Sequence, residues 1–428
     1  MWHLANVLID ADKLIDLDVQ PAERERTTIA SRPVLAALCL LLVALLAGSA
    51  DLARQRPPVV LAAGSADLTF VHGDRLFIVG RAAGAQSLRT YRLPDGRLLG
   101  RATVDGLAPV SDVTQAGGTV LLTDQGTTGG DPETVAVDGT TGRELWRRTA
   151  APVSASAAAG IALLSTSLLG ADFADEAVDL RSGALRWRVP APAGFLTAAG
   201  DAGGLPRWLV SVTPDGRLTS YDGRTGRQVA TTAAVPADES GGYPILAEAD
   251  HLMIGTATGT TAYSLPALTP RWHAETSPPA NTADVVPDSK QTACGPVICT
   301  FRQTRAMSVL DPATGRALWT ANGFVDARPA GAYLLAITAT GVIFVLDAAT
   351  GRVHGDFGGW RGLLGPDGLR YAVHAGADHN TLWYGRLDPA RAIVHVLGSV
   401  RHVSGPCSLG TGVLVCPQAG AVAVWQLA

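Results

Sequence analysis

The chain has 428 residues, of which 47% are hydrophobic and only 17% charged, and it contains 48 glycines and 26 prolines. This composition is typical of a large, turn-rich, all-β domain with an ample core. The formal net charge is −4 and no basic stripe is visible along the sequence, which argues against nucleic-acid binding.

The first 33 residues differ from the rest of the chain. An alternation of apolar and acidic residues is followed by a polar stretch, which is typical of a short cytoplasmic tail. A largely disordered tail with basic residues close to the membrane fits this pattern, and a docking peptide for a cytoplasmic partner is the alternative.

Residues 34–50 are seventeen consecutive uncharged residues. At ~1.5 Å per residue they would reach ~25 Å as a helix, the short end of what a membrane span needs. A cleaved secretory signal ending at Gly48-Ser49-Ala50 is the alternative, but a long and rather acidic preceding segment is a poor n-region. We therefore expect a single transmembrane helix. Arginine is more frequent before it than after it, which favours a cytoplasmic amino terminus at the plasma membrane and an extracytoplasmic remainder.

From about residue 65 a strand–turn–strand unit recurs, with turns of the form Asp-x-x-Thr-Gly that are often followed by tryptophan. The positions that correspond to the turn Asp in successive repeats lie 36 to 46 residues apart, and degenerate copies of the repeat occur near Asp95, at Trp272 and at Asp388. The repeat residues are Asp138, Thr141, Gly142, Trp146, Asp179, Gly183, Trp187, Asp222, Gly226, Asp311, Thr314, Gly315, Trp319, Asp347 and Gly351. A period in the forties with strand-sized units predicts a single β-propeller of four-stranded blades.

The chemistry of the repeat agrees with this fold. An Asp at the first corner can accept backbone N–H groups from the turn, and Gly can adopt the positive φ that reverses the chain tightly. The recurring tryptophan is interpreted as an inter-blade packing residue. Eight turns favour eight blades, with seven or nine as alternatives. The last strands have no following repeat and should pair with an early strand, either 59–63 or 68–73, to close the ring.

The predicted organisation is therefore a tail (1–33), a transmembrane helix (34–50), a linker with a candidate closing strand (51–64) and the propeller (65–428). Four cysteines follow the helix as two local pairs, Cys294 with Cys299 and Cys407 with Cys416. Local pairs in strand–turn contexts predict disulfides and an oxidising compartment, with free thiols or a metal site as alternatives.

The Asp-x-x-Thr-Gly-x-x-x-Trp pattern, seen at Asp138–Trp146 and Asp311–Trp319, resembles the pyrroloquinoline-quinone-type propeller repeat of quinoprotein alcohol dehydrogenases. The same repeat occurs in non-catalytic relatives, including the lipoprotein of the outer-membrane barrel-assembly machinery. The resemblance covers nearly the whole chain from residue 65. It implies the fold but not an activity. The adjacent cysteines that often cover the quinone in the enzymes are missing, and no residue matches a motif around a catalytic base.

Other chemical signals are weak. The one acidic cluster, residues 172–179 with Asp172, Asp175, Glu176 and Asp179, is interpreted as a solvated loop. His374, Asp378 and His379 are interpreted as surface polar residues of a hairpin loop. We predict no catalytic residue, no cofactor and no metal ligand.

The favoured function is a non-catalytic scaffold or sensor that binds a protein or small molecule at one face of the propeller. The candidate contact loops are 125–134, 236–245, 275–292 and 375–381. The alternative is a divergent quinone- and calcium-dependent dehydrogenase, which would need acidic side chains along the axis and a stacking tryptophan such as Trp208, Trp360 or Trp383. A channel of small or apolar residues would favour the scaffold.

Overall fold

The structure is a computed structural model. It describes residues 57–427, apart from 83, 125, 127–130, 167–173, 191–194, 201–203, 214, 235–244, 248–249, 257–258, 276–289, 302–305, 366–367 and 379. Contacts divide the chain into the units Met1–Gln55 and Arg56–Ala428. The tail and the predicted transmembrane helix at 34–50 lie outside the described residues. Among the residues that are described, no helix is long and apolar enough to cross a bilayer.

The described residues fold into nine antiparallel four-stranded sheets, numbered here in chain order. Sheet 1 consists of β2 (Leu68–His72), β3 (Arg75–Ala82), β4 (Ala85–Arg92) and β5 (Arg97–Val104). Sheet 2 consists of β6 (Val110–Ala116), β7 (Thr119–Asp124), β8 (Glu133–Asp138) and β9 (Glu144–Thr149). Sheet 3 consists of β10 (Ala151–Ser156), β11 (Ile161–Ser165), β12 (Ala174–Asp179) and β13 (Leu185–Pro190).

The middle of the chain continues the pattern. Sheet 4 consists of β14 (Phe195–Ala199), β15 (Trp208–Val212), β16 (Arg217–Asp222) and β17 (Gln228–Ala234). Sheet 5 consists of β18 (Ile245–Ala247), β19 (His251–Thr256), β20 (Gly259–Ser264) and β21 (Pro270–Glu275). Sheet 6 consists of β22 (Lys290–Cys294), β23 (Val297–Phe301), β24 (Ala306–Leu310) and β25 (Ala317–Asn322).

The last three sheets complete the ring. Sheet 7 consists of β26 (Phe324–Ala330), β27 (Tyr333–Thr338), β28 (Ile343–Asp347) and β29 (Val353–Asp356). Sheet 8 consists of β30 (Arg361–Gly365), β31 (Gly368–Ala375), β32 (Thr381–Asp388) and β33 (Ile393–Arg401). Sheet 9 combines β34 (Ser408–Gly410), β35 (Val413–Gln418) and β36 (Ala421–Gln426) with β1 (Val59–Ala62) from the other end of the described chain.

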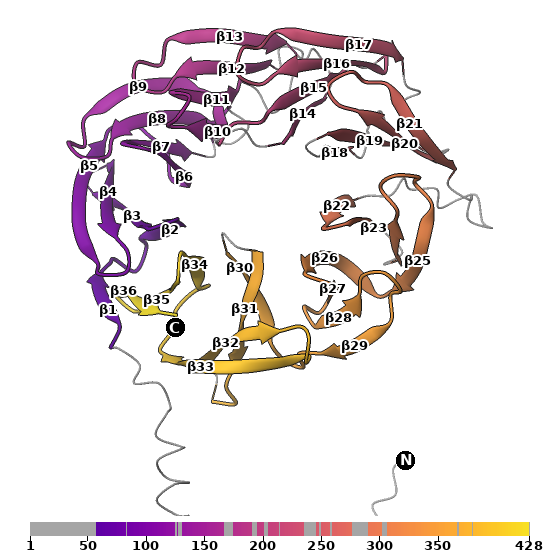
Figure 1. Ribbon diagram of the computed structural model, residues 1–428. Coiled ribbons are helices and arrows are strands. Elements are labelled where there is room, and N and C mark those ends of the chain that lie inside the picture. The colour runs from indigo at the N-terminus through magenta and orange to yellow at the C-terminus, as the bar shows by residue number, and fades with distance from the viewer. Residues whose placement is uncertain are drawn as a thin grey trace, which may run out of the picture. The chain divides into compact units, whose positions relative to one another are not determined.

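The sheets follow one another around a central axis, with the first strand of each sheet innermost (Figure 1). The predicted single β-propeller with four-stranded blades is thus confirmed. The sequence favours eight blades, with seven or nine as alternatives; the described residues form nine, so the favoured count is wrong and the higher alternative is correct. The Asp turn joins the third and fourth strands of a sheet, and in sheet 9 these are β36 and β1, from opposite ends of the described chain. No turn can mark that sheet in the sequence.

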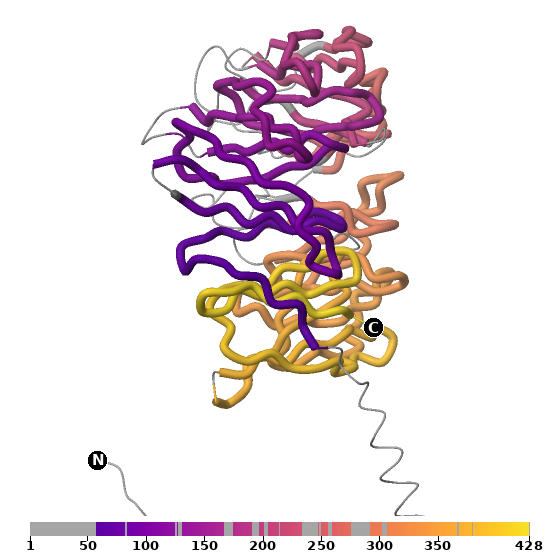
Figure 2. The backbone as a smooth tube through the Cα atoms, turned by 90° about the vertical axis from the view of Figure 1, so that its left-hand side faces the viewer, coloured from indigo at the N-terminus to yellow at the C-terminus, as the bar shows by residue number. Residues whose placement is uncertain are grey.

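The ring closes as the sequence predicts, by pairing of an early strand with the last strands of the chain. β1 lies antiparallel to β36, with Val59 opposite Val424 and Ala62 opposite Ala421. Figure 2 shows the first and last described strands running side by side. Of the two candidate segments, 59–63 is therefore the closing strand, and 68–73 supplies the innermost strand of sheet 1.

An apolar cluster fills each seam between neighbouring sheets. The nine clusters join sheets 1 and 2, 2 and 3, and so on to 9 and 1, so that the ring is held by burial all the way round. The seam between sheets 5 and 6 has the smallest described cluster, Met253, Ala262 and Ile298 with Trp272 and Leu310 packed against it. Each isolated sheet would expose both faces, and stacking buries them. Residues 59–427 contain every described sheet and seam, so the ring has its own continuous core, as a domain that folds by itself requires.

Candidate functional site

The up-and-down order of strands gives the ring two different ends. The Asp turns between third and fourth strands lie at one end, together with the hairpins between first and second strands; we call this end the turn face. The connections between second and third strands, and those from one sheet to the next, lie at the other end, which we call the loop face.

At the turn face each Asp is held by its own turn. Asp138 Oδ1 accepts the backbone N–H groups of Thr140 at 3.0 Å and Thr141 at 2.8 Å, and the N–H of Gly142 donates to the Asp138 carbonyl at 2.8 Å. The hydrogen bonds from the N–H groups of Thr141 and Thr140 hold the pKa of Asp138 below its usual range. The same arrangement recurs at Asp222 and Asp347. These carboxylates serve turn geometry.

The recurring tryptophans connect neighbouring sheets. Their indole N–H groups donate to a backbone carbonyl in the turn of the next sheet: Trp146 to Leu180 at 3.0 Å, Trp187 to Arg224 at 2.9 Å, Trp272 to Pro312 at 2.9 Å and Trp319 to Ala348 at 3.0 Å. Each ring also lies on the turn glycine of that next sheet, respectively Gly183, Gly226, Gly315 and Gly351. The glycine is therefore needed twice, for its positive φ and for the absence of a Cβ beneath the indole.

Where the repeat has lost its tryptophan, a small residue takes the position. Gly100 stands opposite Thr90 in sheet 1, as Trp146 stands opposite Ala136 in sheet 2. A Cβ on Gly100 would lie 2.5 Å from the carbonyl oxygen of Gly139 in the next sheet. The sheets approach more closely at this seam, so backbone contact replaces the indole.

The seam tryptophans give a direct stability test. Trp319→Phe removes the hydrogen bond to Ala348 and should lower the free energy of unfolding by about 1–2 kcal/mol, because the buried carbonyl loses its donor. Trp383→Phe is the matched control, since Trp383 is 42% exposed and lies outside the repeat position. Urea unfolding of both variants makes the comparison, and equal losses would contradict the seam role of Trp319.

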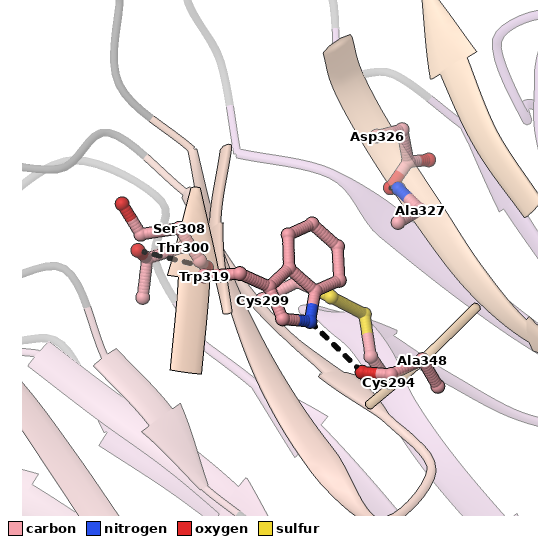
Figure 3. The surroundings of a disulfide bond; sticks show 8 residues. All are labelled: Cys294, Cys299, Thr300, Ser308, Trp319, Asp326, Ala327 and Ala348. Atoms are coloured by element: carbon pink, nitrogen blue, oxygen red, sulfur yellow. Dashed lines mark hydrogen bonds between the residues drawn. A yellow bond between two sulfur atoms is a disulfide. The ribbon is translucent and has the colours of Figure 1, made fainter. Parts of the chain in front are cut away.

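Both predicted disulfides are confirmed. Cys294 bonds to Cys299 across the β22–β23 hairpin, and Cys407 bonds to Cys416 in sheet 9. Figure 3 shows the first disulfide beside the Trp319 indole, whose N–H points to the Ala348 carbonyl. Both cysteines of this pair are buried in the cluster between sheets 6 and 7. The disulfide is therefore part of a seam and not of an exposed redox site.

The described strands that flank all four candidate contact loops end at the loop face. Residues 125–134 and 375–381 span connections between second and third strands, and 236–245 and 275–292 span connections between sheets. Much of these loops, including 236–244 and 276–289, lies outside the described residues. The strands that flank them are described, and these fix the end of the ring from which each loop leaves.

The innermost strands carry few charges. Small and apolar residues predominate, and the exposed apolar side chains there include Leu68, Val153, Val325 and Leu364. The acidic residues within the described innermost strands are Asp112, which accepts a hydrogen bond from Thr114, and Asp326, which forms a 3.0 Å ion pair with Arg328. This composition is the one expected of a scaffold.

The three tryptophans considered for stacking on a quinone lie elsewhere. Trp208 is on β15, a second strand, with the Arg207 guanidinium 5.2 Å from its ring centroid. Trp360 precedes β30 and lies 5.5 Å from the His374 ring, and Trp383 is on β32, a third strand. None of the three belongs to an innermost strand.

Comparison with known proteins shows which family the chain belongs to. The family model described as outer membrane protein assembly factor BamB matches residues 131–356, more than half of the chain. The chain belongs to the BamB family. This agrees with the resemblance of its repeat to the quinone-type propeller. No curated protein matches the chain significantly in sequence.

Solved structures similar to this BamB-family ring share little sequence with it. BamB from Moraxella catarrhalis is 15% identical with a TM-score of 0.45, covering 88% of this chain and 98% of its own. The computationally designed Ika8 protein is 14% identical with a TM-score of 0.44, covering 87% and 98%. The C-terminal WD40 domain of Sif2 is 9% identical with a TM-score of 0.46, covering 87% and 98%. The family assignment rests on the sequence match.

The acidic cluster at 172–179 is not a solvated loop, and that interpretation was wrong for its described part. Residues 174–179 form β12, in which Asp175 and Glu176 are buried. Glu176 forms a 3.1 Å ion pair with Arg148 of the preceding sheet. The Arg148 guanidinium also donates a hydrogen bond to the Gly183 carbonyl. Glu176 thus joins sheets 2 and 3. Asp172 lies outside the described residues.

Among the described residues, no cation lies within ion-pair distance of the Asp175 carboxyl. It stands opposite Ser165 in register, and burial raises its pKa to about 7. The same register position is occupied by Thr134, Leu218, Met307 and Ile343 in sheets 2, 4, 6 and 7. BamB-family sheet 3 therefore carries a buried carboxyl where most of its sister sheets carry an apolar side chain. Sequence periodicity offered no sign of this, because the acidic run resembled a loop.

The remaining predicted polar residues contribute to structure. The interpretation of His374 as a loop residue was wrong, because it lies on β31, with its Nδ1 3.0 Å from the Gly359 carbonyl oxygen. Asp378 lies in the loop and accepts the N–H groups of Asn380 and Thr381. His379 lies outside the described residues. Across the described part of the chain, no group of three or more His, Cys, Asp or Glu side chains is arranged to hold a metal ion.

One cavity of about 410 Å³ lies where sheets 8, 9 and 1 meet. It is lined by innermost strands and includes Phe70, His72, Leu364 and Cys407. Its lining mixes apolar side chains such as Leu363 and Leu409 with polar ones such as Thr69 and Ser408, and so does not indicate an apolar ligand.

Proposed function

We propose that this BamB-family protein is a non-catalytic binding scaffold that is tethered to the plasma membrane by residues 34–50 and holds its propeller outside the cytoplasm. The loop face binds a protein partner. The observation that carries this proposal is topological: four polar loops, widely separated in sequence, leave a rigid ring at one end. Function concentrates on loops that a rigid frame positions.

Two further observations support it. The small and apolar residues along the innermost strands fit a scaffold, and the two disulfides fit an oxidising, extracytoplasmic compartment. The family is named for an outer membrane protein assembly factor, which is consistent with a protein partner.

The loops also indicate the chemistry of that partner. Within the four loop segments the sequence has eight acidic residues and a single basic one, Lys290; the acidic residues are Asp131, Glu133, Asp238, Glu239, Glu275, Asp284, Asp288 and Asp378. Complementary charge steers association and selects partners. We therefore expect the partner to present a basic surface.

Site-specific photocrosslinking in intact cells tests the proposal. The full chain would carry a photoreactive phenylalanine in place of Asp131 or Asp378, which are exposed at the loop face. Matched controls carry it in place of Thr140 or Ala313, which are exposed at the turn face. The expected result is a discrete protein adduct from the loop-face positions only. The same adducts from both faces, or none from the loop face of a stably produced protein, would contradict it.

A further inference from the structure

The described chain enters the propeller at a defined end. β1 is the fourth strand of sheet 9 and runs antiparallel to β36, so it begins at the turn face. The contact of Val59 with Gly96, in the turn between β4 and β5, agrees with this placement. Any segment that precedes β1 must therefore approach the ring from the turn face.

Chain length then limits how far this face can be from a membrane. This step rests on the proposed tether at 34–50, which leaves residues 51–58 as the connection. Eight residues can span at most roughly 26–29 Å when fully extended. The connection itself contains Arg54 and Arg56. With this proposed tether, the short connection would hold the turn face near the bilayer and leave the loop face as the far end.

The turn face also presents a series of exposed arginines. They recur because Arg follows the turn glycine in several repeats or stands within the turn: Arg97, Arg143, Arg181, Arg224, Arg227, Arg316, Arg352 and Arg391. Within the described residues, all of them except Arg391, which lies 3.7 Å from Asp388, have no carboxylate within ion-pair distance. We call these eight residues the arginine rim.

The acidic residues at this end are differently placed. The described ones are Asp74, Asp95, Asp138, Glu144, Asp179, Asp222, Asp250, Asp311, Asp347 and Asp388. Most of the turn carboxylates accept N–H groups of their own backbone, for example Asp222 from Thr225 at 2.8 Å and Asp347 from Thr350 at 2.8 Å. Others are paired, as Asp179 is with Arg186 at 2.6 Å. They are fixed at the ring, whereas the rim arginines have long side chains that can extend toward an anion.

We propose that the arginine rim binds the phosphates of anionic lipid headgroups, so that the propeller stands on the membrane with its turn face down and its loop face outward. Guanidinium groups bind phosphate bidentately. The four loop segments at the other end carry eight acidic residues and one lysine, so an anionic surface would repel them. The orientation leaves the loop face free for the partner.

Vesicle binding by the ring alone tests the lipid contact without the tether. A fragment of residues 51–428 contains every sheet and seam and is mixed with vesicles of equimolar phosphatidylglycerol and phosphatidylcholine, or of phosphatidylcholine alone. We expect binding to the anionic vesicles only, weakened by salt because exposed charges are screened.

Two matched triple variants locate the contact. Arg227→Gln, Arg316→Gln and Arg352→Gln together should lower partitioning of the ring onto the anionic vesicles on the order of 100-fold, because each arginine contributes a factor of roughly five. Arg217→Gln, Arg361→Gln and Arg401→Gln remove the same charge from the loop-face end and should change it little. Equal losses in the two variants, no binding by the wild-type ring, or equally tight binding to soluble inorganic polyphosphate would overturn the proposal. Loop-face crosslinking would be unaffected by that failure, so the two proposals fail separately.

Discussion

Replacing Asp175 with asparagine should stabilise the propeller at about pH 8, on the order of 4 kcal/mol, and have little effect near pH 4. The free carboxyl has a pKa of about 3.9 in an unfolded chain, whereas burial raises it to about 7 in the fold. The free energy of unfolding is therefore largest below the lower of these two pKa values, where Asp175 is protonated in both the folded and the unfolded chain. The free energy of unfolding falls as pH rises from about 4 to about 7, and the loss is complete above that range.

Urea unfolding of wild type and variant across this pH range measures the difference directly. Asp112→Asn is the control, because it makes the same chemical change on an exposed side chain and should alter stability little. An Asp175→Asn effect that does not change with pH, or one that is destabilising at alkaline pH, would show that the carboxylate has a partner when ionised.

The second large effect is expected at a seam. Gly351→Ala should lower the free energy of unfolding by about 2–4 kcal/mol. Gly351 has a φ of +72°, which costs an L-residue about 1–2 kcal/mol, and its new Cβ would lie 2.5 Å from the Trp319 ring. The indole is fixed by its bond to Ala348 and by the disulfide beside it, so it cannot move away cheaply.

Gly331→Ala separates the two causes. Gly331 lies in the same sheet with a φ of +66°, but a Cβ there would meet nothing within 4 Å. This variant should show only the backbone cost, about 1–2 kcal/mol. If the two variants lose the same stability, the indole is not packed tightly enough on Gly351 to matter.

The repeat made most of the fold predictable, because each Asp turn must join two neighbouring strands whatever lies around it. The ninth sheet was not predictable from turns, because its third and fourth strands, β36 and β1, are separated in sequence by nearly the whole described chain. β12 was misread for a different reason. Its Ala-Asp-Glu-Ala-Val-Asp sequence lacks apolar alternation, and only the neighbouring sheets show that Glu176 meets Arg148 and that Asp175 is buried.

The candidate site was predictable in part. The loops are recognisable in the sequence by their length and polarity. Only the strand order shows that all four leave the ring at the same end. The arginine rim was missed because its members are one or two per sheet, so no basic run appears in the sequence. The signal that could have found it is the Arg that follows the turn glycine, as at Arg143, Arg227, Arg316 and Arg352.

We propose that this BamB-family ring is a binding scaffold and not a quinone enzyme. Calorimetric titration of the 51–428 ring with pyrroloquinoline quinone and Ca²⁺, separately and together, tests that claim most directly. A folded ring that shows no saturable heat is the predicted result. Saturable binding of the quinone with micromolar or tighter affinity would contradict the claim and direct attention to Asp112 and Asp326 on the innermost strands.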